Sequence, residues 1–394
     1  RLTMKKLLLI LLCLPFIGFG QLTYVPDDAF EGFLEANGMG NGISNDDYVN
    51  TSSIDTVTVL HIMYFLYPSD LTGIEDFASL EQLNCSQLQL TSLDLSQNSA
   101  LTELICWGNQ LTTINISNNS ALINLDCNSN QLTSLDVSQN FDLKYLKCYG
   151  NQITSLNVSN NPDLVELNCG DEFAGGNELI NLDVSQNIFL THLSLGYNDV
   201  TSLDISNNIN LISLICNQNS DYFPLSNLDV SNNTQLQYLV CNDNQLTYLD
   251  LTNNIALNYL MCQDNQIQGL DLSECNNLIE LGCYDNQLTS LDVKNGNNNN
   301  FIFFRCDGNA NLNCINVDDA AWSNTNWTQS SFTFDSQHYF SNNCPPLTLT
   351  QEYTKNNKPF KVADLLGRET KGKKNKPLFY IYDDGSVEKK IIIE

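Results

Sequence analysis

Apolar and polar positions follow one another in a fixed order that repeats every 21 residues through the middle of the chain. Three consecutive copies read LTELICWGNQL from Leu101, LINLDCNSNQL from Leu122 and LKYLKCYGNQI from Leu143. Within each copy the leucine and cysteine of the LxC core alternate with other residues. Because side chains of a strand alternate between its two faces, this core predicts a short strand with both residues pointing inward. A second apolar phrase of the LDVS type closes each copy and predicts another short extended segment.

The repeat has the pattern LxxLxLxxNxL, with cysteine in place of the third leucine. Such a pattern with a period of 20–29 residues is the signature of a leucine-rich repeat, and units this small bury their apolar edges only by stacking. We therefore predict a mainly β leucine-rich repeat solenoid, horseshoe-like, with a parallel sheet and 21-residue rungs. About twelve rungs are expected, beginning at Val57, Leu80, Leu101, Leu122, Leu143, Leu164, Leu190, Leu211, Leu236, Leu257, Leu278 and Phe301.

Two rungs are longer than the others, with insertions at 170–176 and 220–224 that both follow the strand phrase. Both loops should emerge along one edge of the solenoid, where insertions are often functional.

The ends of the chain predict separate parts. Residues 1–20 carry Lys5 and Lys6 before an apolar run, which is typical of a secretory signal peptide and too short to anchor in a bilayer. Residues 21–56 contain a short amphipathic helix and should form an N-terminal cap before the array at 57–310. Residues 311–346, where the period is lost, should form an aromatic C-terminal cap, and a cap with a small core gains from a disulfide between Cys314 and Cys344. Residues 347–394 should form a linker and a further domain.

Two columns of identical residues follow from the repeat. Parallel, in-register cysteines point the same way rather than at each other, and Leu195 takes their place in one rung. Buried thiols acting as small apolar side chains are therefore favoured over disulfides or a soft-metal site. The cysteines are Cys85, Cys106, Cys127, Cys148, Cys169, Cys216, Cys241, Cys262, Cys283 and Cys306. The asparagines expected to close the strand turns are Asn109, Asn130, Asn151, Asn177, Asn198, Asn219, Asn244, Asn265, Asn286 and Asn309.

A third column is acidic and has two interpretations. The carboxylates could hold Ca²⁺, or they could cap turns through backbone hydrogen bonds, which Asn115 and Asn157 in the same column favour. No cofactor is otherwise expected. The acidic members are Asp94, Asp136, Asp183, Asp204, Asp229, Asp250, Asp271 and Asp292.

Charge limits the partners. The formal net charge is −28, and between residues 21 and 350 four basic residues face 38 acidic ones. A body this acidic repels nucleic acid and anionic lipid, so we expect neither nucleic-acid binding nor membrane insertion of the mature chain.

Aromatic residues recur at outward positions of the strand phrase. Exposed aromatics on a rigid sheet are typical of binding surfaces, although tyrosine also simply favours strands. The candidate ligand-binding residues are Trp107, Tyr145, Lys147, Tyr149, Tyr238, Tyr259, Met261 and Tyr284. The three histidines lie in different regions, and no nucleophile, phosphate-loop or metalloprotease motif occurs, so no catalytic residue is predicted.

The unit LxxLxCxxNxLTxLDVSxN at 57–310 resembles the leucine-rich repeat proteins exported by Bacteroidetes. The tail resembles the type A C-terminal sorting domain of the type IX secretion system, although Pro377, Leu378 and Phe379 stand where many such tails have a glycine before the tyrosine. The resemblance implies an immunoglobulin-like β-sandwich, recognised by the secretion machinery, and a location on the outer-membrane surface or outside the cell. The matching residues include Asp364, Gly367, Arg368, Asp384, Gly385 and Lys389.

These observations lead to one expectation and one alternative. We expect a secreted or cell-surface protein that binds a protein or glycan without catalysis, as an adaptor or adhesin does, through its strand face. The alternative is a structural surface protein stabilised by Ca²⁺.

Overall fold

The computed structural model describes residues 21–62, 68–172, 175–217 and 224–345, together with three strands of the tail. The chain divides into two compact units, Arg1–Cys344 and Pro345–Glu394. Among the described residues no helix combines the length and apolar character needed to cross a membrane.

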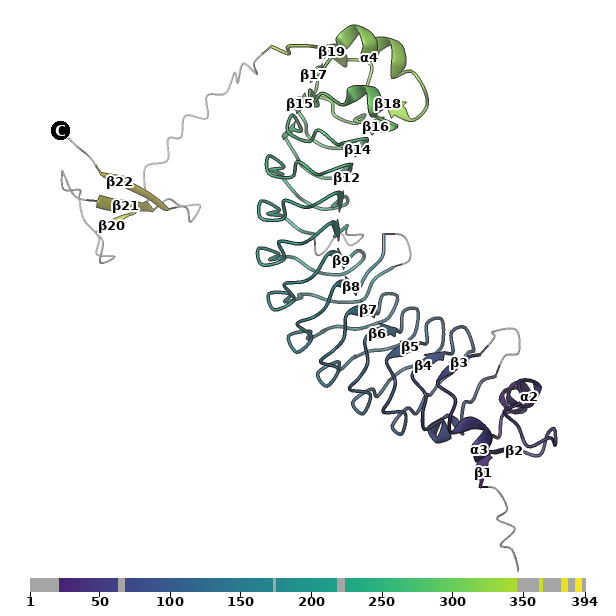
Figure 1. Cartoon of the computed structure of the whole chain (residues 1–394). Helices are drawn as coiled ribbons and strands as arrows, with labels where there is room; N and C mark the ends of the chain where they lie inside the picture. The colour runs from purple at the N-terminus through teal and green to yellow at the C-terminus, as the bar shows by residue number, and fades with distance from the viewer. Residues whose placement is uncertain are drawn as a thin grey trace, which may run out of the picture. The chain divides into compact units, whose positions relative to one another are not determined.

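The first unit is a curved solenoid whose strands line its concave side (Figure 1). Thirteen strands form one parallel sheet, and neighbours pair in register, so that Leu104 lies beside Leu125 and Leu125 beside Leu146. This confirms the predicted parallel-sheet solenoid. The strands are β3 Val59–His61, β4 Gln82–Asn84, β5 Glu103–Ile105, β6 Asn124–Asp126, β7 Tyr145–Lys147, β8 Glu166–Asn168, β9 His192–Ser194, β10 Ser213–Ile215, β11 Tyr238–Val240, β12 Tyr259–Met261, β14 Glu280–Gly282, β16 Phe303–Arg305 and β18 Phe332–Thr333.

The return side of each rung is mostly irregular backbone. Near the C-terminal end it becomes regular enough to form a second parallel sheet of four strands, β13 Gly269–Asp271, β15 Ser290–Asp292, β17 Cys314–Asn316 and β19 Tyr339–Ser341. The helical elements of the described array are two short 3₁₀ turns, η2 Ile74–Asp76 and η3 Asn298–Asn300. The LDVS phrase is therefore extended, as predicted, but it pairs with its neighbours as a sheet only in the rungs near the C-terminal end.

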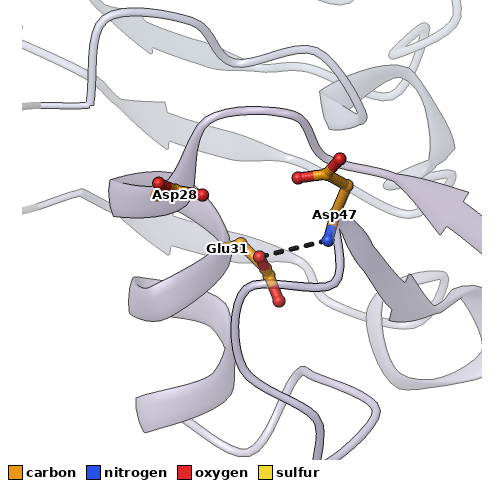
Figure 2. Close-up of side chains that lie close together, drawn as sticks. All are labelled: Asp28, Glu31 and Asp47. Carbon is orange, nitrogen blue, oxygen red and sulfur yellow. Dashed lines mark hydrogen bonds between the residues drawn. The ribbon is translucent and has the colours of Figure 1, made fainter.

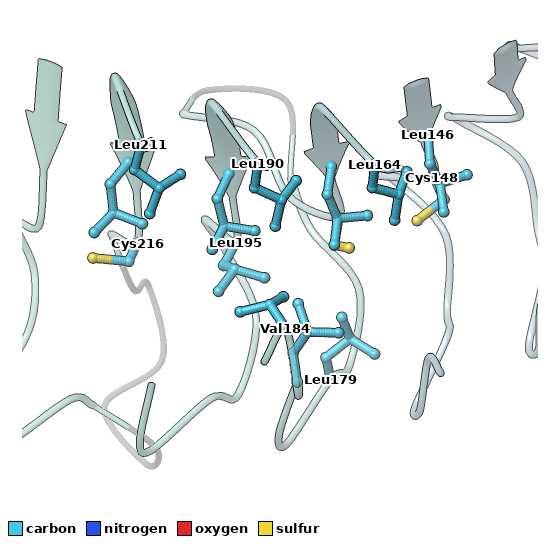
Figure 3. Close-up of a cluster of buried hydrophobic side chains, with 14 of the residues drawn as sticks. Leu146, Cys148, Leu164, Leu179, Val184, Leu190, Leu195, Leu211 and Cys216 are labelled. Carbon is cyan, nitrogen blue, oxygen red and sulfur yellow. The ribbon is translucent and has the colours of Figure 1, made fainter. Parts of the chain in front are cut away.

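The core runs as one continuous column between the two sides of the solenoid. Figure 3 shows leucines and cysteines from successive strands pointing the same way, with Leu195 in the column that holds Cys148 and Cys216. The ten column cysteines and Cys275 are buried and free. The thiols thus act as small apolar side chains, as the sequence predicts.

The N-terminal cap covers the first rung. It consists of β1 Leu22–Tyr24 paired antiparallel with β2 Tyr48–Asn50, and of α2 Asp28–Ala36 and α3 Thr51–Ile54. The helix α2 begins after Asp27, whose carboxylate accepts hydrogen bonds from the backbone N–H groups of Ala29 and Phe30. Such N-caps satisfy donors that the helix itself leaves free.

The C-terminal cap contains one more rung than the sequence predicts. Strand β18 continues the main sheet beside β16, and β19 continues the second sheet beside β17, so residues 331–344 form a thirteenth rung. Between β17 and β18, α4 Ala320–Asn326 leads to Trp327, whose ring packs against Phe304, Phe332 and Phe340. Aromatic rings here fill the space that leucines fill elsewhere, and the leucine period therefore misses this rung.

The second unit contains three antiparallel strands, β20 Lys361–Ala363, β21 Pro377–Ile381 and β22 Val387–Ile391. The pairing of β21 with β22 runs from Pro377 beside Ile391 to Ile381 beside Val387. Lys389 lies in β22, whereas Asp364, Gly367, Arg368, Asp384 and Gly385 lie outside the described residues, as does the expected signal peptide.

Candidate binding surface on the strand face

Tyrosines from neighbouring strands meet on the concave face. Tyr238 on β11 lies in register with Tyr259 on β12, and the two rings stack with centroids 4.2 Å apart and planes 10° apart. Both side chains are partly exposed. The strand alternation therefore places these two candidate residues together, on a backbone held by hydrogen bonds on both sides.

The insertion after β8 reaches this pair. Tyr238 donates a hydrogen bond of 2.8 Å from its hydroxyl to Glu172 Oε2, although β9 and β10 lie between their strands. Burial raises the pKa of Glu172 above its ordinary value, and burial and the bond to Glu172 raise the pKa of Tyr238. Sequence reasoning predicted a functional insertion but did not single out Glu172.

Small residues lie where the insertion after β8 begins and passes close to the next rung. Gly170 and Gly196 are buried, and a Cβ atom on Gly170 would lie 1.8 Å from the carbonyl oxygen of Gly196. Ser194 donates a hydrogen bond to the carbonyl oxygen of Gly170. The backbones of the sixth and seventh rungs therefore approach closely where the insertion begins.

Further along the face, a third tyrosine carries a cation. The guanidinium carbon of Arg305 lies 4.1 Å from the ring centroid of Tyr284. Asp307 accepts hydrogen bonds from Arg305 Nε at 3.2 Å and from Nη2 at 3.1 Å. The Arg305 guanidinium thus contacts both the ring of Tyr284 and the carboxylate of Asp307. Arg305 stands at an outward position of its strand phrase, so the alternation that identified the tyrosines could have identified it.

The other candidate group lies near the N-terminal half of the sheet. Lys147 Nζ lies 3.2 Å from Glu166 Oε1, and Tyr145 is 40% exposed. Burial, with Asp126 nearby, raises the pKa of Tyr149. Trp107 is partly buried and follows β5, one strand away from β6 and two from β7. Among the described residues no ring contact joins Trp107 to either tyrosine, so these residues share a face without forming one cluster.

Met261 does not face a ligand. Its side chain is 8% exposed, and a Cβ atom on Gly282, its partner on β14, would lie 2.6 Å from the Met261 sulfur. The methionine therefore lies over the neighbouring glycine and fills the space left by the missing side chain.

A groove runs beside the tyrosines at the N-terminal ends of the strands. It has a volume of about 780 Å³, and Ile212 and Gln237, which directly precede Ser213 and Tyr238, line it. Phe189, 52% exposed, and Asp163 also line it. The groove and the face thus share an edge along β10 and β11.

The aspartate column is engaged in turns. Ser96 N–H donates to Asp94 at 2.9 Å, and the same bond recurs at Asp136 and Asp183. Hydrogen bonds from Ser96 lower the pKa of Asp94. These bonds account for the column as turn chemistry and leave Ca²⁺ without a specific observation in its favour.

Acidic side chains also gather in the N-terminal cap. Figure 2 shows Asp28, Glu31 and Asp47, whose oxygens lie within 4.8 Å of one another. The fully buried Glu31 accepts backbone N–H groups from Asp46 and Asp47, at 3.3 and 3.4 Å. These bonds tie α2 to the following loop, which is a structural role.

One cysteine has a histidine beside it. Cys306 Sγ lies 3.7 Å from His338 Nδ1, and His338 Nε2 lies 3.6 Å from Asp335 Oδ2. The order resembles nucleophile, base and orienting acid, but burial raises the pKa of Cys306 well above its usual range. A buried, protonated thiol is a poor nucleophile. Burial likewise raises the pKa of Cys216 and Cys262 to about 12.

Comparison with known proteins finds similar solved structures. No protein-family model matches the sequence, and no curated protein matches it. The functional domain of InlJ from Listeria monocytogenes, which includes a cysteine ladder, is 32% identical, with 76% of this chain and 68% of that chain covered and a TM-score of 0.66. The internalin InlF from Listeria monocytogenes is 20% identical, with 82% and 97% covered and a TM-score of 0.57, and shows the shared fold. With its repeat, its parallel-sheet solenoid and its cysteine column, the chain belongs to the leucine-rich repeat proteins.

Proposed function

We propose that this chain is a non-catalytic binding protein that takes a protein partner on its concave strand face. The observation that carries the proposal is the aromatic row on β11, β12 and the residue after β14. Tyr238 stacks on Tyr259, and Tyr284 holds Arg305 on a sheet whose strands are fixed on both sides. Rigid, partly exposed tyrosines and arginines are the residues that most often dominate binding energy at protein interfaces.

The similarity to the InlJ domain supports a binding role, because that region is described as the functional domain of its protein and contains the same kind of cysteine ladder. Two features of the array favour binding over catalysis. Aspartates of the LDVS phrase are engaged in turns, and the Cys306 thiol beside His338 is buried.

We also propose that the protein is exported to the cell surface or the medium. The apolar leader at 1–20 and the tail at 347–394 support this, since the tail resembles a type IX sorting domain. Deletion of residues 358–394 should leave the protein in the periplasm, as measured by fractionation. Normal secretion of the shortened chain would refute the sorting role.

A binding screen tests the main proposal. The full chain should be immobilised and exposed to purified surface proteins and to a glycan array. We expect a protein ligand whose affinity falls at least tenfold, or roughly 1.4 kcal/mol, in Tyr259→Ala. Tyr248→Ala is the matched control, because Tyr248 is 64% exposed and lies outside the strand phrase. A glycan ligand in place of a protein, or equal affinity in both variants, would refute the proposal.

A further inference from the structure

The strand face contains one complete set of ring, guanidinium and carboxylate. Arg305 lies over the ring of Tyr284 and is held by Asp307, so the protein itself shows how this surface accepts an arginine side chain. The ring comes from one rung, and the cation and the acid come from the next.

A second set on the same face lacks its cation. Tyr238 offers a partly exposed ring and Glu172 offers a carboxylate, and the two are joined by the 2.8 Å hydrogen bond. Oε1 of Glu172 makes no hydrogen bond to another described residue. Ring and acid are thus fixed relative to each other, as they are around Arg305, while the guanidinium is missing.

The neighbour in register on the other side of the ring is a small residue. Tyr238 stacks on Tyr259 through one face, and on its other side the partner in register is Ser213 on β10. The next residue in the row is His192 on β9, whose Nδ1 lies 2.9 Å from the hydroxyl of Thr191. A single small side chain therefore separates two rings that lie two strands apart, at roughly 9.6 Å for a strand spacing of about 4.8 Å. A planar group stacked between two rings needs about 7 Å.

The chain has few basic residues to balance the charge of Glu172. Between Lys147 and Arg305 the sequence holds one basic residue, Lys294, and its Nζ donates to the carbonyl oxygen of Asn342 on the return side. The groove beside Tyr238 has an apolar lining that includes Phe189, and it carries one acid, Asp163, and one base, Lys144. An acidic surface with an apolar groove is complementary to a basic segment that also carries an apolar residue.

We propose that Tyr238 and Glu172 receive an arginine side chain from a basic segment of the protein partner, and that this segment lies along the adjoining groove. The inference rests on the proposed function and specifies the partner's chemistry. Arginine is favoured over lysine because its planar guanidinium stacks on a ring while its N–H groups donate to a carboxylate in the same plane. The arginine stacks on the free face of Tyr238 above Ser213 and donates to Glu172. The segment's apolar residue covers Phe189.

Synthetic peptides test the proposal on the full chain. The probes are fluorescein-labelled, amidated (Gly-Arg)₄, (Gly-Lys)₄ and (Gly-citrulline)₄, titrated by anisotropy in 150 mM salt. We expect the arginine peptide to bind at least fivefold more tightly than the lysine peptide, and the citrulline peptide not to bind. Glu172→Gln and Tyr238→Leu should each weaken the arginine peptide at least tenfold. Tyr238→Phe, which keeps the ring, should weaken it less.

Matched controls separate a site from general attraction to an acidic surface. Tyr248→Leu removes an exposed tyrosine outside the strand phrase, and Asp243→Asn removes an exposed charge, so both should leave the affinity within twofold. Equal binding of the arginine peptide to Glu172→Gln and the unchanged chain would overturn the proposal. Binding only after deletion of the lysine-rich residues 358–394 would also overturn it, because the chain's own tail would then be the occupant.

The same variants distinguish this inference from the proposed function. A protein ligand from the screen that is weakened by Tyr259→Ala but not by Glu172→Gln would leave the binding face standing and reject the arginine site. Loss of that ligand in both variants, together with competition by the arginine peptide, supports both.

Discussion

In most of the described interior rungs an asparagine amide closes the strand turn, whereas in the thirteenth rung a carboxylate and an imidazole occupy that turn, and a disulfide joins β17 to the segment after β19. Asn130 accepts the N–H of Leu111 and donates to the carbonyls of Cys106 and Cys127. At the other end, Asp335 accepts the N–H groups of Gly308 and Asn309, at 3.1 and 3.0 Å. Amides do not titrate and carboxylates do, so the amide-closed strand turns should be insensitive to pH, and the end should respond to both pH and redox state.

The interior contains a second, different column of asparagines on the return side. Each donates its amide to two carbonyls of neighbouring rungs, as Asn140 does to Ile116 and Asn119, while its buried Oδ1 atom has no hydrogen-bond partner. The members are Asn98, Asn119, Asn140, Asn161, Asn187, Asn208, Asn233 and Asn254. The strand-turn asparagines thus use both the oxygen and the NH₂ group of the amide in hydrogen bonds, whereas the return-side asparagines use only the NH₂ group.

The largest expected effect is the loss of a strand-turn amide in the interior. Asn130→Ala leaves the buried N–H of Leu111 without a partner, at roughly 1–3 kcal/mol. It also removes one of the two amide donors from each of the carbonyls of Cys106 and Cys127, at roughly 0.5–1.5 kcal/mol per hydrogen bond. We expect the free energy of unfolding to fall by about 3–5 kcal/mol, measured by urea denaturation.

Asn118→Ala is the control for that experiment. Asn118 lies in the preceding return segment, is exposed, and makes one bond to the carbonyl of Ser96. Its loss should cost less than about 0.5 kcal/mol, as is usual for surface changes. Equal effects of the two changes would mean that the amide column does not hold the interior together.

The disulfide should have the next largest effect, confined to the end. Cys314 and Cys344 are joined with Cα atoms 5.8 Å apart and 30 residues between them in sequence. Closing a loop of this length stabilises a fold by about 2–4 kcal/mol. In Cys314→Ser/Cys344→Ser, hydrogen exchange should accelerate in β18 and β19 and stay unchanged in β5 to β8. Reductant should have no further effect on the double variant, and faster exchange throughout would contradict a local role.

The return-side column gives a smaller effect that sharpens the contrast between the two asparagine columns. Asn140→Ala removes one of two donors from each of the carbonyls of Ile116 and Asn119, which keep a backbone N–H donor. Losing these two hydrogen bonds should cost roughly 1–3 kcal/mol, below the cost of Asn130→Ala, because no N–H group is left unpaired. Asn140→Cys should recover part of the loss, because Cys275 takes the same place and its Sγ lies 3.8 Å from the carbonyl oxygen of Asn254. Urea denaturation of both variants checks the order, and a cost for Asn140→Ala equal to that of Asn130→Ala would erase the distinction.

The two columns also show what the sequence could predict. Asn130 follows a strand phrase of fixed length, so its role in closing the turn follows from the repeat. Asn140 stands among polar residues in SQNFD, a composition that is typical of an exposed loop, and its burial depends on carbonyls of other rungs. The thirteenth rung was missed because Phe332 and Phe340 replace the leucines that define the period.

The candidate binding surface could also be predicted from the sequence only in part. Alternation along the strand placed Tyr238 and Tyr259 outward, because their backbone is set by the sheet. Glu172 lies in an insertion whose path follows from contacts with strands three places away, and no period describes that path. Met261 was placed outward correctly as a strand position, but its burial depends on the absence of a side chain at Gly282.

The smallest expected effect is a pH response of the thirteenth rung through His338. Its Nδ1 accepts the N–H of Asp335 at 3.2 Å, and burial lowers its pKa below the ordinary value of 6.5 despite the nearby Asp335 carboxylate. The unfolded chain therefore takes up a proton first as pH falls below about 6.5, and stability is lost between that pH and the lower folded pKa. Hydrogen exchange in β19 should accelerate on going from pH 7.5 to 5.5, after correction for the intrinsic exchange rate, while β12, which contains no carboxylate or histidine, stays unchanged. His338→Gln should remove the response and His192→Gln, on the exposed strand face, should keep it. An equal response in β12 would mean that the interior also depends on a group that titrates between pH 7.5 and 5.5, and the division between amide-closed interior turns and a titratable end would fail.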